Sequence, residues 1–408
     1  MGSLLSCARS TSAGKPKGFN DQFQLGPELG KGHFATVNIC TAKKTGDKFA
    51  VKIINKRKVT NPMAMREEVA VLRRVGKHRH CVELISVHED DNNFFLIMEL
   101  CTGGDLFSRI VDYGNYSEKD AGRTLQQLAL ALDHIHKQGV THRDLKPENI
   151  LLVSNMADSD LKVGDFGLSK ILDGDQVIMK TICGTWAYCA PEVIEQKPYT
   201  SLVDNWTLGV LMFILLSGYH PFDDYGDLPE PELLERIVNC EYNFEDPVWN
   251  DISEPPKQII RSLLKLDPPQ RMSLEVFLAH PWINGGIANA APLTGTITRM
   301  QSFNSGRKGK TGLVSQYSTT MMDAEPSLDS KANFATTIAK KRISESVAEE
   351  EGDSQAGADE VSVNAETSKA NLDGQIPGAG TTHTVQFGDA NIIADPPNLQ
   401  IEQEQDSV

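Results

Sequence analysis

The chain has 408 residues, of which 40% are hydrophobic and 23% are charged, a composition typical of a globular protein with two to three domains. This composition excludes a collagen-like chain, a small disulfide-stapled domain and a wholly disordered protein. The net charge of −15 argues against nonspecific nucleic-acid binding, because neutralising phosphates requires a basic surface. Residues 321–408 hold 17 acidic and 5 basic residues, so most of the negative charge belongs to the C-terminal tail.

Seven cysteines are scattered along the chain without a C-x-x-C pair. A disulfide framework or a zinc site is therefore not expected, and a reducing, cytoplasmic compartment fits best. The longest apolar run, GVLMFILL at residues 209–216, is too short to span a bilayer and predicts a buried helix. The N-terminal MGSLLSC lacks the long apolar stretch of a secretory signal.

The predicted elements change character along the chain. Residues 1–22 are small, polar and slightly basic, which predicts a flexible arm. From residue 23 to about residue 100, β-branched runs broken by glycine turns predict short antiparallel strands, with one amphipathic helix at residues 63–75. Helical patterns then dominate up to residue 283. The sequence therefore predicts a small β-rich unit followed by a larger helical unit.

The periodic signal fades after residue 283. Residues 321–408 are acidic and polar and contain two aromatic residues, Phe334 and Phe387. Such a tail cannot bury enough apolar surface to offset its chain entropy, so we expect it to be disordered. The expected segments are an arm at 1–22, a folded body at 23–283, a glycine-containing basic segment at 284–320 and an acidic tail at 321–408.

A glycine-rich segment joins the first two predicted strands. Its glycines allow a hairpin to close over phosphate oxygens. The third glycine of a G-x-G-x-x-G pattern is replaced by Ala35, and a plain glycine hairpin would explain the same residues. The candidate phosphate-binding residues are Leu29, Gly30, Lys31, Gly32, His33, Phe34, Ala35, Thr36 and Val37.

A lysine, Lys52, follows Ala50 within the next apolar strand run. Burying a lysine on a strand is costly unless an acidic group pairs with it. Glu68, within the predicted helix, is the expected partner. The alternative is that Lys52 is an exposed strand lysine and that Glu68 is an ordinary charge on a helix surface.

The sequence HRDLKPEN at residues 142–149 carries three groups suited to phosphoryl transfer. Asp144 can accept a proton from an attacking hydroxyl, Lys146 can neutralise charge on the moving phosphoryl group, and Asn149 supplies an amide oxygen for a metal ion. Further along, Asp165 of a D-F-G sequence is a hard oxygen ligand suited to Mg²⁺. Each motif could arise by chance, but the whole set in this order argues strongly against that.

With these motifs, residues 23–283 resemble the catalytic domain of a eukaryotic protein kinase. The resemblance extends to CGTWAYCAPE, to D-x-W-x-x-G and to a final HPWI. It implies an α+β, bilobal protein kinase fold with a β-rich N-terminal lobe and a larger helical C-terminal lobe. It also implies that Glu192 pairs with Arg271, and that Asp204 braces the backbone of residues 142–144.

The resemblance implies that ATP binds between the lobes with Mg²⁺. Lys52, fixed by Glu68, would hold the α- and β-phosphates. Asn149 and Asp165 would hold Mg²⁺, and Asp144 would orient the substrate hydroxyl. The remaining residues expected at the nucleotide are Val37, Ala50 and Leu151 around the adenine, Met98 behind it, the backbone of Glu99 and Cys101 along its edge, and Asp105 beside them.

Two features suggest which kind of kinase the chain resembles. GGDLF and HPWI resemble the calcium/calmodulin-dependent group, and KPEN is typical of Ser/Thr kinases rather than tyrosine kinases. Asp105 and Glu148 are placed to meet a basic residue three positions before the acceptor. Where some related kinases carry a further carboxylate, this chain has Ile214, so a strong demand for arginine at minus two is not expected. A monomer acting on proteins with basic residues before Ser or Thr is the expectation.

Two regulatory segments follow from the same resemblance. Thr181 is the candidate phosphate acceptor, and Arg143 would bind the phosphate placed on it. Residues 296–310 resemble the autoinhibitory and calmodulin-binding segment of the group, although three glycines at positions 306, 309 and 312 weaken a helix and a basic linker remains the alternative. Thr296 lacks an arginine three positions before it, whereas Ser302 has Arg299 there and is the better autophosphorylation candidate.

The N-terminus matches the M-G-x-x-x-[ST] pattern of myristoylation at Gly2, with Cys7 available for a second acyl chain. A single myristoyl chain binds membranes only marginally, with an association constant of about 10⁴ M⁻¹, so Cys7 or nearby basic residues would have to assist. A chance match in a polar arm is the alternative. Two functions remain: an active kinase, or a lipid-anchored scaffold whose kinase fold has little catalysis.

Overall fold

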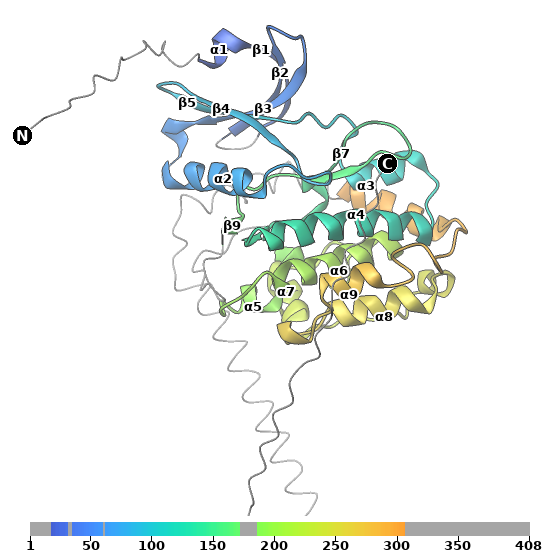
Figure 1. The fold of residues 1–408 in the computed structure, drawn as a ribbon. Helices are drawn as coiled ribbons and strands as arrows, with labels where there is room; N and C mark the ends of the chain where they lie inside the picture. Colours follow the sequence, from blue (N-terminus) through green and yellow to red (C-terminus); the bar gives the residue numbers. More distant parts are fainter. Residues whose placement is uncertain (1–17, 32–34, 60–61, 172–185, 307–408) are drawn as a thin grey trace, which may run out of the picture. The chain divides into compact units, whose positions relative to one another are not determined.

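The computed structural model describes residues 18–31, 35–59, 62–171 and 186–306. All of them belong to the first of two units into which the chain divides, Met1–Glu345 and Ser346–Val408. Within the first unit, an antiparallel sheet with helix α2 forms one lobe, and a helical lobe follows it (Figure 1). This is the α+β, bilobal arrangement that the sequence predicts.

The N-terminal lobe is built on a five-stranded antiparallel sheet with the order β1-β2-β3-β5-β4. The β-branched runs form strands because glycine turns separate them. The fourth strand begins only at Leu84, because Val82 donates its backbone amide to the Val163 carbonyl and Cys81 bridges to the same residue. The strands are β1 Phe23–Lys31, β2 Ala35–Ala42, β3 Lys48–Asn55, β4 Leu84–Glu89 and β5 Asn93–Met98.

A short helix, α1 (Phe19–Gln22), precedes the sheet and packs on it. The Phe19 ring stacks on Phe95 with centroids 4.5 Å apart and lies 5.7 Å from the Phe23 ring. The outer face of this sheet needs an apolar cover, which Phe19 supplies. The last five residues of the expected flexible arm, 18–22, are therefore part of the folded lobe.

Helix α2 (Pro62–Val75) occupies the region where the sequence predicts a helix. Its apolar side is buried, with Met65, Val71 and Leu72 in the core. The same helix turns Glu68 toward strand β3, so the packing of its apolar side decides where that carboxylate lies.

The helical lobe surrounds α6 (Leu202–Ser217), in which residues 203–217 are all buried. An apolar surface all round the helix is typical of a helix in the centre of a domain, as the run at 209–216 predicts. The other helices are α3 Leu106–Tyr113, α4 Glu118–Lys137, α5 Pro191–Ile194, α7 Glu230–Asn239, α8 Glu254–Leu263 and α9 Leu274–Ala279. The 3-10 turns are η1 Lys56–Lys58, η2 Pro147–Asn149, η3 Trp186–Tyr188, η4 Pro247–Asp251 and η5 Pro268–Gln270.

Two small antiparallel pairs of strands flank the segments that carry the sequence motifs. Strand β6 (Val140–Thr141) pairs with β9 (Lys170–Ile171), and β7 (Ile150–Leu152) pairs with β8 (Leu161–Val163). These pairs bracket residues 142–149 and Asp165. They bring together motifs that the sequence separates.

Buried polar contacts tie the helical lobe together. The carboxylate of Glu118 accepts hydrogen bonds from the Ser253 backbone amide at 2.8 Å, the Ser253 hydroxyl at 2.7 Å and the Trp282 indole at 2.7 Å. The Arg271 guanidinium donates two parallel hydrogen bonds to the Glu192 carboxylate, and both N···O distances are 2.7 Å. The predicted Glu192–Arg271 pair is confirmed.

Residues 294–306 form a further helix beyond the expected end of the folded body. Thr296 and Met300 are buried against the helical lobe, and the Thr296 hydroxyl donates to the Leu216 carbonyl. Gly218 has a φ of +83° and leaves no room for a side chain beside this helix. The first part of the 284–320 segment thus packs on the lobe. Within the part of the chain that the structure describes, no helix is long and apolar enough to cross a membrane.

Candidate active site

An ionic chain crosses the space between the lobes. Lys52 Nζ on β3 lies 2.6 Å from Glu68 Oε1 on α2 and 3.2 Å from Asp165 Oδ1. Burial alone would lower the pKa of Lys52, but Asp165 and Glu68 together raise it well above its usual value. The alternative of an unpaired, exposed strand lysine is wrong.

Asp165 is held in an uncommon backbone conformation, with a φ of 54°. The Gly164 amide donates to the Asn149 carbonyl at 2.8 Å, and Phe166 is buried with its ring 5.2 Å from the His142 ring. The Lys52 ammonium lowers the pKa of Asp165 to about 2, although burial opposes this effect. The Asp165 carboxylate therefore stays ionised at neutral pH.

The loop at residues 142–149 places two side chains around the Asp144 carboxylate. Asp144 Oδ2 accepts hydrogen bonds from Lys146 Nζ at 2.8 Å and from Asn149 Nδ2 at 3.1 Å. Asn149 Nδ2 also donates to the Asp144 carbonyl at 2.7 Å, which fixes the orientation of its amide. Burial would lower the pKa of Lys146, but Asp144 raises it, so Lys146 remains a cation.

A buried carboxylate on α6 supports this loop from behind. Asp204 accepts hydrogen bonds from the backbone amides of His142 and Arg143, each at 2.9 Å, and from His136 Nε2 at 2.7 Å. The predicted bracing role of Asp204 is confirmed. His136 was not predicted, since no spacing in the sequence links it to Asp204.

Stability should depend on Asp204 in a pH-dependent manner. Burial would raise the pKa of Asp204, but the hydrogen bond and charge of His136, together with His142 and the Arg143 amide, bring it below its usual value. A carboxyl with a depressed pKa stabilises the fold above its unfolded pKa of about 3.9 and loses that contribution as the pH falls through the lower folded pKa. Acid therefore removes the stabilising contribution of the Asp204 carboxylate.

We expect Asp204→Asn to lower the free energy of unfolding by about 1.5–3 kcal/mol at pH 7, the range for hydrogen bonds to charged groups. The deficit relative to the wild type should begin to shrink at pH 3, below the unfolded pKa of about 3.9, because the unfolded wild-type chain then binds a proton that the folded Asp204 carboxyl still resists. Urea unfolding of both proteins at pH 7, 5 and 3 measures this. A deficit that stays constant over the three pH values would contradict it.

The predicted nucleotide-binding residues of the N-terminal lobe line one end of the sheet. Val37 pairs with Lys52 and with Gly30 across adjacent strands, and Ala50 pairs with Met98. Leu29, Gly30 and Lys31 are exposed, while Ala35, Thr36 and Val37 are half-buried. Gly32, His33 and Phe34 lie outside the described residues.

The segment linking the lobes carries Glu99 and Cys101. The Glu99 amide donates to the Glu83 carbonyl at 3.0 Å, so among its backbone groups only the carbonyl can face a base. Burial raises the pKa of the Cys101 thiol to about 11, which keeps it neutral. Leu151 on β7 bridges to Asp105 and brings the helical lobe beneath the same segment.

Asp105 has a structural task that was not predicted. It is the N-cap of α3: one carboxylate oxygen accepts from the Ser108 amide at 3.0 Å and the other from the Ser108 hydroxyl. The D-L-F-S sequence carries this signal, because Asp is a strongly preferred N-cap residue. Of the predicted regulatory residues, Ser302 is exposed on the helix at 294–306, whereas Thr181, Gly2 and Cys7 lie outside the described residues.

A second unpredicted residue is Lys162 on β8. Its ammonium is 2.8 Å from the Glu99 carboxylate. The available signal was a lysine in the middle of the short apolar run LKV, three residues before Asp165. Such a position favours a buried, paired cation.

Two oxygen donors at this site suit a divalent cation that phosphates also bind. Among the described residues, no group of three or more histidine, cysteine or carboxylate side chains could hold a metal ion alone. Asp165 is ionised, and Asn149 has its amide nitrogen committed to Asp144, which leaves its oxygen as the metal-binding atom. One carboxylate and one amide oxygen suit Mg²⁺ shared with phosphates, because Mg²⁺ usually takes few protein ligands.

Comparison with known proteins identifies the family. The model of the protein kinase domain matches residues 23–283. Human calcium/calmodulin-dependent protein kinase type IV is 40% identical over 291 residues, which cover 71% of this chain and 60% of that protein. The chain thus spans about 60% of the length of that relative.

Two further relatives are covered more completely. Rat calcium/calmodulin-dependent protein kinase type 1B is 42% identical over 286 residues, covering 70% of this chain and 82% of that protein. A probable myosin light chain kinase of Dictyostelium discoideum is 38% identical over 305 residues, covering 74% and 76%. The chain therefore belongs to the protein kinase family and, within it, to the calcium/calmodulin-dependent group.

Proposed function

We propose that this protein transfers the γ-phosphoryl group of ATP to serine or threonine residues of other proteins, with Mg²⁺. The observation that carries the proposal is the convergence of two clusters. The Lys52–Glu68–Asp165 chain spans the lobes, and Asp165 is tied through Gly164 to the loop that holds Asp144 and Asn149. An arrangement of this kind supplies the positioning and charge neutralisation that phosphoryl transfer requires.

Each side chain has a distinct task in this mechanism. Lys52 holds the phosphates of ATP, and Glu68 fixes its direction. Asp144 accepts the proton of the attacking hydroxyl as the new phosphate ester forms and the bond to the ADP oxygen breaks. Lys146, 2.8 Å from Asp144, neutralises charge on the phosphoryl group in transit. Asp165 and Asn149 would hold Mg²⁺, whose chemistry is to offset the charge of the phosphates.

The deciding experiment is transfer of labelled γ-phosphate to a basic peptide, measured with and without Ca²⁺ and calmodulin. The names of the relatives favour calmodulin dependence. Transfer that rises with calmodulin would support both proposals, and transfer that ignores it would leave the kinase and remove calmodulin. Binding of MgADP without any transfer would instead favour a scaffold function.

We also propose a preference for arginine three positions before the acceptor. Asp105 and Glu148 would receive it, although the carboxylate of Asp105 already caps α3. A positional peptide library tests this: equal rates with arginine or alanine at minus three would remove the preference.

Activation by phosphorylation of Thr181 is a further part of the proposal. Arg143, beside Asp144, donates to the Tyr199 hydroxyl at 3.1 Å and to the Leu168 carbonyl, so its guanidinium already links the loop to neighbouring segments. A phosphate on Thr181 would add charge-assisted hydrogen bonds to this cation. Full activity of Thr181→Ala after treatment with an upstream kinase would count against the switch.

The helix at 294–306 bears on autophosphorylation. Thr296 is 1% exposed and donates to Leu216, whereas Ser302 is exposed and has Arg299 three positions before it. We expect autophosphorylation at Ser302 rather than Thr296 while this helix stays packed. Mass spectrometry after incubation with MgATP measures this, and phosphate on Thr296 alone would contradict it. Calmodulin binding would engage residues 296–310.

Acylation at the N-terminus also remains a proposal, resting on the sequence around Gly2 and Cys7 alone. Metabolic labelling with a myristate analogue tests it. Label that persists in Gly2→Ala would remove the assignment.

A further inference from the structure

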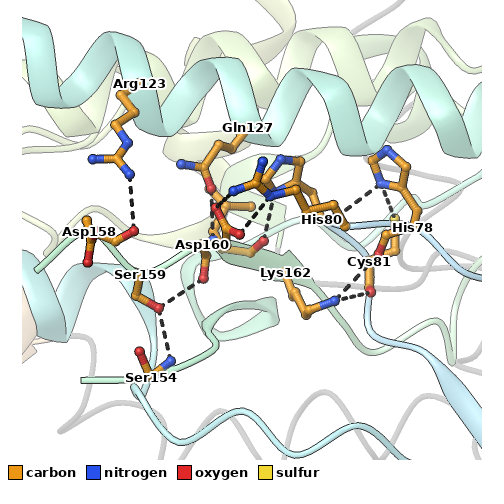
Figure 2. Close-up of polar contacts among 12 residues, drawn as sticks. His78, His80, Cys81, Arg123, Gln127, Ser154, Asp158, Ser159, Asp160 and Lys162 are labelled. Atoms are coloured by element: carbon orange, nitrogen blue, oxygen red, sulfur yellow. Dashed lines mark hydrogen bonds and ion pairs between the residues drawn. The ribbon is translucent and has the colours of Figure 1, made fainter. Parts of the chain in front are cut away.

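A buried lysine lies behind the segment that links the lobes. Lys162 is 8% exposed, and its ammonium lies 2.8 Å from Glu99 Oε2. It also donates to the Cys81 carbonyl at 3.2 Å and to the His78 carbonyl at 3.5 Å, as Figure 2 shows. Burying an ammonium is costly unless its donors are satisfied. Lys162 is therefore held by one carboxylate and two backbone carbonyls.

The three partners of Lys162 come from two different segments. Glu99 lies in the linking segment, Cys81 and His78 lie in the loop that follows α2, and Lys162 itself is three residues before Asp165. Backbone hydrogen bonds join the same segments: Val163 donates to His80 at 2.9 Å, and Glu99 donates to Glu83 at 3.0 Å. The Lys162 side chain thus connects the segment that links the lobes to the loop after α2, the helix that carries Glu68, and to the strand that leads to Asp165.

The strand that carries Lys162 is itself firmly placed. Gln127 on α4 accepts from the Leu161 amide at 2.9 Å, and the His80 ring is 3.1 Å from the Leu161 carbonyl (Figure 2). Arg79 forms two hydrogen bonds with Asp160, at 2.7 and 3.0 Å, on the exposed side of the cluster. Lys162 therefore projects from a firmly held strand toward the segment that links the lobes.

The two histidine rings beside Lys162 carry no charge at neutral pH. The His78 ring stacks on His134 of α4 at 4.4 Å, and the His134 ring nitrogen is 2.7 Å from the Val75 carbonyl. Burial and the neighbouring imidazoles lower the pKa of His78 to about 4, and burial lowers that of His80. Both rings are neutral, so the ion pair with Glu99 balances the charge of Lys162.

We infer that Lys162 is a positioning residue for adenine: it holds Glu99 from behind, so that the Glu99 carbonyl and the Cys101 backbone face the base. The inference rests on the proposed function. Because the Glu99 amide is committed to Glu83, recognition depends on where that carbonyl points. Without Lys162, the Glu99 carboxylate, which is 29% exposed, would turn toward water and draw the segment with it.

The test is the affinity of the full-length protein for MgADP, measured by calorimetry. Lys162→Met should weaken it about tenfold, which corresponds to about 1.4 kcal/mol for loss of the Lys162–Glu99 ion pair. Glu99→Gln, which removes the partner charge without touching the buried lysine stem, should weaken it similarly. The double variant should be no weaker than either single variant, because both break one interaction. Lys162→Arg should recover most of the affinity.

Further measurements separate positioning from general damage. Arg79→Met, which breaks the exposed Arg79–Asp160 pair in the same cluster, should leave MgADP affinity unchanged. In Lys162→Met, inhibition by adenosine should weaken while inhibition by tripolyphosphate does not, and the KM for ATP should rise without a change in kcat or in the KM for peptide. Equal weakening toward adenosine and tripolyphosphate would overturn the inference.

The remaining outcomes are also decisive. If Lys162→Met binds MgADP as well as or better than the wild type, or if the two single variants add, Lys162 does not position the adenine site. If Lys162→Met does not fold, Glu99→Gln and Lys162→Arg carry the same comparison. A wild-type protein that binds no MgADP would overturn the proposed function itself, which distinguishes that failure from the failure of this inference.

Discussion

Asp144→Asn should lower kcat for phosphorylation of a basic peptide by about 10²–10⁴-fold, the range that a positioned general base contributes. Asparagine keeps the size of the side chain but cannot take up the hydroxyl proton. Its amide would also meet the donors Lys146 Nζ and Asn149 Nδ2, which now point at a carboxylate oxygen. The loss should fall on kcat, with MgADP affinity unchanged, because the lost interaction forms in the transition state.

A matched control lies on α4. Asp133→Asn removes a carboxylate that pairs with Lys137 at 2.7 Å on an exposed helix surface, and should leave kcat unchanged. Initial rates at saturating ATP, together with calorimetry of MgADP, measure both variants. If Asp144→Asn kept more than about a tenth of the wild-type kcat, general-base catalysis by Asp144 would not explain the reaction.

The lobes, the main strands and the motif-bearing loops could be predicted because their signals are local. Glycine turns separate the strands, apolar residues at helical spacing form α2, and the all-apolar α6 indicates burial. The Lys52–Glu68 pair could be predicted as well, because a strand lysine needs an acidic partner and the next helix offered one.

Other features depend on contacts that the sequence does not mark. The sequence predicts that Phe19 belongs to a polar arm. In the structure its ring covers the outer face of the sheet by stacking on Phe95, a residue 76 positions away. The sequence makes Thr296 a poorer acceptor than Ser302 only through the missing arginine. Its burial against Leu216 follows from the packing of the helix at 294–306, whose glycine-containing continuation suggested a weak helix. In both cases the partner lies far away in the chain, and no spacing rule connects the two.

The site shows the same division. Asp144, Asn149 and Asp165 could be predicted from short motifs with known chemistry. The partners of Lys162 and His136 could not be predicted, because both residues act indirectly. Lys162 pairs with Glu99, and His136 bonds to Asp204. Residues that act through another residue carry no motif of their own, so their roles become visible only in the folded structure.

The second large effect is expected from the buried ion pair between Arg271 and Glu192. The side chains are 0% and 6% exposed, and Arg271 also donates to the carbonyls of Lys265 and Leu202 at 2.9 and 3.0 Å. Removing one partner leaves the other as an uncompensated buried charge. Arg271→Met should therefore lower the free energy of unfolding by about 3–5 kcal/mol.

A loss of this size should lower the midpoint of thermal unfolding by roughly 6–20 °C for a domain of this length. Arg271→Lys should recover only part of it, because one ammonium cannot reproduce two parallel hydrogen bonds to a carboxylate. Arg261→Met is the control: it removes an exposed pair with Glu254, 2.6 Å long, and should change stability by less than about 1 kcal/mol. Equal losses for Arg271→Met and Arg261→Met would show that the buried pair does not hold the helical lobe together, since burial is what separates the two arginines.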